Sequence, residues 1–88
     1  MARIEISLDA SEDLQSLPAD VQDRVKTKLL GEVADDPKRH LRPLSNVDAS
    51  IIRIGEYRVI ADYNRNDDAL RIHQIGHRRN IYDRDLGE

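Results

Sequence analysis

The sequence contains no cysteine, tryptophan or phenylalanine, and its tyrosines number three. Without cysteine, the chain forms no disulfide, no zinc–thiolate centre and no thiol nucleophile. No apolar run approaches the roughly 20 residues that cross a bilayer. The N-terminus, MARIEISLDA, carries charges inside its apolar stretch and is not typical of a signal peptide. We therefore expect a cytoplasmic protein with no membrane partner.

The chain is short, with 88 residues and a mass of 10.1 kDa. This length predicts one domain over residues 1–88, and the polar segment 83–88 reads as a frayed tail. Apolar residues make up 39% of the chain and recur in regular patterns, which is typical of a globular fold and not of a disordered segment.

The net charge of −3 is unevenly distributed. Residues 1–36 hold four basic and nine acidic residues, whereas residues 37–82 hold nine basic and five acidic residues. Eleven of the 14 basic residues are arginine, whose planar guanidinium pairs with phosphate bidentately. The excess of aspartate and the scarcity of lysine resemble the composition of proteins from salt-accumulating organisms. At high salt, long-range electrostatic steering is screened, and binding depends on direct contacts. The second half is therefore the candidate anion-binding part.

The first half predicts a strand and two helices. Alternation over residues 2–8 predicts a strand with Ile4, Ile6 and Leu8 on one face. Asp9 and Ser11 are good N-cap residues for a short helix that ends before Pro18. A four-residue apolar repeat from Ala19 to Val33 then predicts an amphipathic helix of about four turns.

The second half predicts a polar connection and three strands. Asp35-Asp36-Pro37 ends the long helix, and residues 37–50 form a connection with two prolines. Gly76 is expected to break the pattern after the last strand. The predicted strands, turn and hairpin loop are Ile51–Ile54, Gly55-Glu56, Tyr57–Tyr63, Asn64–Asp68 and Ala69–Ile75.

These elements predict an α+β fold in the order βααβββ. A helical hairpin covers one face of a small, mainly antiparallel sheet and leaves the other face available. Arginines interrupt the apolar pattern where the strands follow one another, and Arg53 and Arg58 flank the predicted turn. The full set of these arginines is Arg53, Arg58, Arg71, Arg78 and Arg79.

Two segments resemble the RelE/ParE toxin superfamily of type II toxin–antitoxin systems. They are IIRIGEYRVIADY at 51–63 and IHQIGHRRNIYD at 72–83, and the upstream strand, helices and Asp-Pro step agree with the same family. The resemblance covers residues 2–83 and favours the RelE-like branch and its fold. It implies a toxin that a cognate antitoxin holds and that cleaves mRNA in the ribosomal A site, with no small-molecule substrate.

The resemblance also implies the functional residues. Arg58, Arg78 and Tyr82 take the catalytic positions, and Arg53 takes an RNA-binding position together with His77 and Arg79. Cleavage without a metal uses the 2′-hydroxyl as nucleophile, so it needs a base, an acid and fixed cations, but no cofactor and no metal ligand. The arginines are suited to stabilising phosphate charge, and either Tyr82 or His77 is suited to act as the base.

Two alternatives remain open. Ile51 stands where the first hairpin strand of this family often has a second basic residue, and the chain is acidic overall. Both features favour a ParE-like toxin that poisons DNA gyrase. The third reading is a catalytically degenerate toxin that serves as an antitoxin-binding module.

Overall fold

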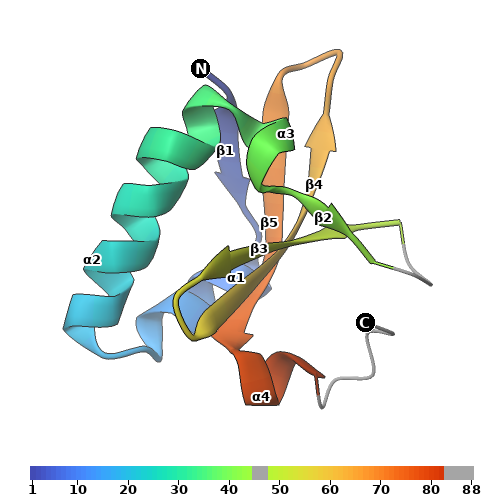
Figure 1. Ribbon diagram of the computed structural model, residues 1–88. Coiled ribbons are helices and arrows are strands. Elements are labelled where there is room, and N and C mark those ends of the chain that lie inside the picture. Colours follow the sequence, from blue (N-terminus) through green and yellow to red (C-terminus); the bar gives the residue numbers. More distant parts are fainter. Residues whose placement is uncertain (45–47, 83–88) are drawn as a thin grey trace.

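Five strands form one sheet in the order β1-β5-β4-β3-β2. The computed structural model describes residues 1–44 and 48–82, with Tyr82 described by its backbone alone, and the predicted tail at 83–88 lies outside the described residues. β1 runs parallel to β5, and every other neighbouring pair is antiparallel (Figure 1). The strands are β1 (Arg3–Ile6), β2 (Arg42–Pro43), β3 (Ser50–Ile54), β4 (Tyr57–Asn64) and β5 (Ala69–His77). The predicted α+β class and mainly antiparallel sheet are confirmed.

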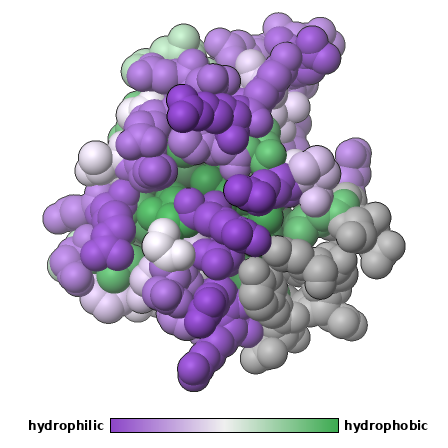
Figure 2. All heavy atoms as spheres, viewed as in Figure 1, coloured by the Kyte–Doolittle hydropathy of each residue, from purple (hydrophilic) through white to green (hydrophobic). Residues whose placement is uncertain are grey.

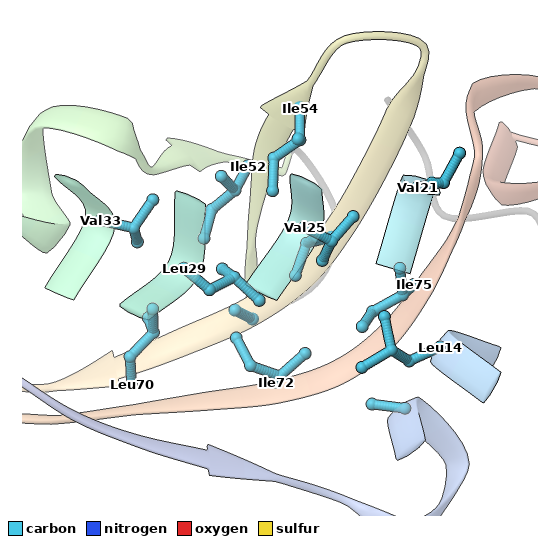
Figure 3. Close-up of a cluster of buried hydrophobic side chains, with 13 residues drawn as sticks. Leu14, Val21, Val25, Leu29, Val33, Ile52, Ile54, Leu70, Ile72 and Ile75 are labelled. Atoms are coloured by element: carbon cyan, nitrogen blue, oxygen red, sulfur yellow. The ribbon is translucent and has the colours of Figure 1, made fainter. Parts of the chain in front are cut away.

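Helices α1 (Leu8–Gln15) and α2 (Ala19–Lys28) form the predicted hairpin on one face of the sheet. Their apolar residues bury against the strands in the main core (Figure 3). Val25, Leu29 and Val33 come from the long helix, and they pack against Ile52 of β3 and Leu70 of β5 among others. Burial of this apolar surface, at about 25 cal/mol per Å², is the main source of stability.

The start of α1 differs from the prediction. Ser7, and not Asp9 or Ser11, is the N-cap, because its Oγ accepts a hydrogen bond from the Ala10 amide at 3.1 Å. The strand therefore ends at Ile6, and Leu8 opens the helix with 76% of its surface exposed. The predicted strand was two residues too long, because it was drawn from the alternation of three apolar residues. The hydrogen bond of the Ser7 cap starts the helix before that alternation ends.

The long helix changes its winding near its end. Leu29–Val33 is π-helical, and within it Leu30 is exposed whereas Leu29 and Val33 are buried. The segment predicted as a polar connection contains two short elements, α3 (Pro37–His40) and β2. β2 forms because Arg42 and Pro43 pair with β3. This is a tertiary contact, and no local sequence pattern at 37–50 predicts it.

Gly76 does not break the last strand, which continues to His77 and leads directly into α4 (Arg78–Tyr82). A side chain at Gly76 would sit 3.2 Å from the Ile81 Cδ1 atom. Glycine is therefore used here for the close approach of α4 to the strand and not for a turn.

The sheet face away from α1 and α2, called here the far face, is partly covered. Leu44, Ile51, Ile60 and Ile81 form a second, smaller apolar cluster on it. The expectation of a fully available face was wrong, because α4 and the segment before residue 45 supply two of these side chains. The surface seen in Figure 2 is mainly hydrophilic, with a hydrophobic band across its middle. Within the described part of the chain, no helix is long and apolar enough to span a membrane.

Candidate nucleic-acid interface

The tight turn between β3 and β4 organises the candidate site. Gly55 has a φ of +60°. Positive φ at the first central position, and not at Glu56, is typical of a type II′ hairpin turn, which glycine adopts without steric cost. The turn sets the register so that Arg53 lies opposite Arg58. Both side chains point to the far face, since their strand neighbours belong to the main core.

Arg58 is the one charged residue that the described structure buries, with 7% of its surface exposed. Its Nη1 donates hydrogen bonds to the carbonyl oxygens of Gly55 and Tyr57, both at 2.9 Å. Its Nε is buried and has no hydrogen-bond partner among the described residues. A buried guanidinium is costly unless its donors are satisfied, so the Nε atom is an unused donor on the far face.

Arg78 reaches the same turn from the start of α4. Its Nε lies 3.0 Å from a carboxylate oxygen of Glu56, and its backbone amide donates to the Glu56 carbonyl at 2.9 Å. Both partners of the ion pair are more than half exposed, so this contact contributes less than about 1 kcal/mol. We call Arg53, Arg58 and Arg78 the turn cluster.

His77 does not join the turn cluster. It pairs with Tyr57 across β4 and β5, and the two rings meet edge to face with centroids 5.5 Å apart. Tyr57 packs against the main core, so His77 lies on the helix-covered face. β5 remains a strand through Gly76, and alternation turns the next side chain, His77, away from the face of the turn cluster. The RNA contact of His77 stays a prediction.

The other predicted residues occupy different positions. Arg79 is exposed on α4, and its amide donates to the His77 Nδ1 at 3.3 Å, so His77 caps this short helix. Tyr82 is the last residue of α4, and its side chain lies outside the described part. Arg71 lies five residues before Gly76 on β5 and bonds the Glu5 carboxylate at 3.3 Å, far from the turn.

Sequence reasoning missed Arg24. This residue of α2 places its Nη1 atom 3.4 Å from where a side-chain Cβ on Gly55 would stand. No linear signal connects a helix position with a turn 31 residues later, since only tertiary packing brings them together.

Ionisable side chains at the opposite end of β4 form separate contacts. The His73 Nε2 lies 2.5 Å from an Asp62 carboxylate oxygen, and the Tyr63 hydroxyl donates to Asp68 at 2.5 Å. The bond to Asp68 raises the pKa of Tyr63. Among the described residues, no group of three or more histidines or acidic side chains is placed to hold a metal ion.

Comparison with known families decides the identity of the chain. Residues 4–82 match the family of ParE toxins of type II toxin–antitoxin systems (parDE). The chain belongs to this family. It is therefore a toxin of the RelE/ParE superfamily, as the two sequence segments predicted. Among curated proteins, none matches the chain significantly.

Solved structures agree on the fold. The RelBE2 toxin–antitoxin complex from Mycobacterium tuberculosis has a chain with a TM-score of 0.83 and 23% identity, covering 88% of this toxin and 98% of that chain. The isolated RelE toxin from E. coli has a TM-score of 0.74 and 18% identity, covering 98% and 96%. The RelE–RelB complex from Pyrococcus horikoshii has a TM-score of 0.62 and 26% identity, covering 88% and 94%. The RelE-like fold is thus confirmed.

Proposed function

We propose that this toxin is a RelE-like, ribosome-dependent mRNA endoribonuclease that works without a metal. The observation that carries the proposal is the buried Arg58 guanidinium, whose Nε donor is unused beside the cations Arg53 and Arg78. Fixed guanidinium groups in a site of low dielectric are suited to stabilising the negative charge that develops on a phosphate during cleavage.

The proposed reaction is attack of the RNA 2′-hydroxyl on the adjacent phosphate. The 2′-hydroxyl loses its proton to a base as its oxygen forms a bond to phosphorus. The bond to the leaving 5′-oxygen breaks as that oxygen takes up a proton from an acid, and a 2′,3′-cyclic phosphate remains. Arg58 and Arg78 stabilise the phosphorane charge, and Arg53 positions the backbone. Tyr82 is the proposed base, because His77 faces the helices. Arg79, exposed on α4, is a proposed RNA contact.

Access to Arg58 is part of this proposal. With 7% of its surface exposed, Arg58 contacts a phosphate only after a local opening of the far face. Ile81 packs over Gly76, the residue directly opposite Arg58 on β5, so α4 borders the opening. Among the described side chains of this five-residue helix, Ile81 is the buried apolar one, and an element that buries little apolar surface opens at low free-energy cost.

The proposed regulator is a cognate antitoxin protein in the same cytoplasm. Family membership in toxin–antitoxin systems supports it, and the similar chains from M. tuberculosis and P. horikoshii come from toxin–antitoxin complexes. An acidic antitoxin segment would complement the turn cluster electrostatically.

Gyrase poisoning is the second candidate. The matching family is that of the ParE toxins, and the enclosed Arg58 side chain already bonds two backbone carbonyls. If these bonds are its whole role, Arg58 is a structural residue of the turn and the turn cluster needs no RNA.

One experiment with two readouts separates these functions. The full chain is added to a reconstituted translation reaction, in which primer extension maps breaks in the message, and to a supercoiling reaction with purified DNA gyrase, in which broken DNA is measured. The proposal expects breaks in A-site codons, intact DNA, and a loss of cleavage of at least about 100-fold in Arg58→Ala, the range seen when a charge-stabilising donor is removed.

Arg65→Ala is the matched control, because it removes the same charge from an exposed position at the other end of β4. It should cleave at the wild-type rate. Broken DNA with an intact message would establish the gyrase alternative. Intact message and intact DNA, together with harmless expression, would establish the degenerate binding module.

A further inference from the structure

Arg24 lies against the turn from the helix side. It is an exposed residue of α2, and its guanidinium reaches Gly55, whose carbonyl accepts a bond from Arg58. Gly55 thus has one arginine on each side, from two different layers of the fold. In Figure 1 the β3–β4 turn lies between the first part of α2 and α4, which agrees with these contacts.

We propose that Arg24 is a further phosphate-binding residue, which extends the RNA path from the turn cluster over Gly55 to the helix-covered side. The proposal rests on the proposed RNA function and names a residue outside the two segments, 51–63 and 72–83, that resemble the family. One RNA strand would then place successive phosphates on the far face and at Arg24.

The charges around the turn support this path. Four arginines gather at Gly55-Glu56, while Glu56 is the carboxylate that the structure pairs with one of them, Arg78. The next basic residue along this side of α2, Lys28, has its ammonium 3.1 Å from Glu32. Within the described part of the chain, the Arg24 side chain has no ion pair or hydrogen bond.

The turn itself is exposed at both of its central residues, Gly55 and Glu56. Gly55 presents no side chain, so the Arg24 guanidinium lies close against its backbone, with Nη1 3.4 Å from where a Cβ would stand. Phosphate groups accept hydrogen bonds from backbone amides and arginines together, and exposed turns with adjacent cations are suited to this contact.

The test measures binding of a short single-stranded RNA by fluorescence anisotropy over a series of KCl concentrations. The variants are Arg24→Gln, Arg24→Lys and the control Lys26→Gln, which removes one exposed positive charge from the same helix. We expect Arg24→Gln to bind about tenfold more weakly, and its plot of log K against log salt to be shallower by about 0.7, as for one lost phosphate contact on a single strand. Arg24→Lys should regain most of the affinity, since an ammonium also binds phosphate.

The outcomes are distinct. Wild-type affinity and salt slope in Arg24→Gln, with RNA cleavage intact, would overturn the Arg24 contact and leave the proposed function standing. Weaker binding with an unchanged slope would also overturn it, since that result indicates a role in holding the turn. If the wild-type chain neither binds nor cleaves RNA, the proposed function and the Arg24 contact fail together.

Discussion

Arg53 and Arg58 face each other across β3 and β4, so one cross-strand pair joins two positive charges. Like charges directly opposite one another destabilise a sheet by up to about 1 kcal/mol. In the proposed function, a phosphate bound beside this pair would offset the repulsion between the two guanidinium groups. The pair is placed by a two-residue turn and reinforced by Arg78, so the arrangement is set by backbone geometry and not by flexible surface side chains.

The first prediction concerns the stability of the turn itself. Arg58→Ala removes the donor of two carbonyl bonds, and we expect the free energy of unfolding to fall by about 1–3 kcal/mol, since bonds to a charged group are worth this much. Urea denaturation measures the change, and Arg65→Ala is the control. An Arg58→Ala variant as stable as wild type would show that the carbonyl bonds do not hold the turn.

The second prediction compares two glycines. Gly55→Ala forces an alanine into positive φ, so we expect a loss of about 1 kcal/mol of stability. The nearest atom, Arg24 Nη1 at 3.4 Å, is at ordinary contact distance, so no steric clash adds to this loss. Gly31→Ala has open space around it in a helical segment, and it should stabilise the chain by about 0.5–1 kcal/mol. Equal effects of the two substitutions in urea denaturation would contradict this account.

The third prediction concerns the docking of α4. In Gly76→Ala the new methyl group stands 3.2 Å from Ile81 Cδ1 and 3.3 Å from Ile81 Cγ1, so Ile81 must move. We expect a loss of about 1–3 kcal/mol from this overpacking. Adding Ile81→Val removes the closer of these two atoms, so the double variant should be more stable than the sum of the single changes predicts. Strict additivity in a double-mutant cycle would mean that the two residues are not in contact.

The fourth prediction concerns acid stability. A hydrogen bond from Arg3, followed by one from Arg71, lowers the pKa of Glu5 below its ordinary value of 4.5. A lowered pKa stabilises the fold above pH 4.5, and this stabilisation disappears as the pH falls through the folded-state pKa. Glu5→Gln should therefore be less stable than wild type at neutral pH, and the difference should close in acid. Glu12→Gln, on the exposed side of α1, controls for the loss of one negative charge.

The helical hairpin and the β3–β4 hairpin could be predicted from the sequence because their signals are local. A four-residue apolar repeat specifies α2, and glycine at the turn with alternating strands specifies the Arg53–Arg58 placement, which the register confirms. The roles of these residues in binding and cleavage stay predictions.

The remaining features depend on contacts between distant segments. β2 forms because it pairs with β3, and Gly76 stays in a strand because Ile81 packs over it. Because β5 continues through Gly76, the His77 side chain lies on the helix-covered face, which the expected end of the strand at Ile75 did not indicate. The proximity of Arg24 to Gly55 results from the packing of α2 on the sheet, so the local sequence does not predict it.

The most direct measurement uses a message in which one A-site nucleotide lacks its 2′-hydroxyl. In the reconstituted translation reaction, the account predicts cleavage of the all-RNA message to a 2′,3′-cyclic phosphate and no cleavage at the 2′-deoxy position, because the nucleophile is missing. Cleavage of both messages at the same position, or of neither, would contradict the proposal that the arginines around Gly55 stabilise an internal attack on RNA.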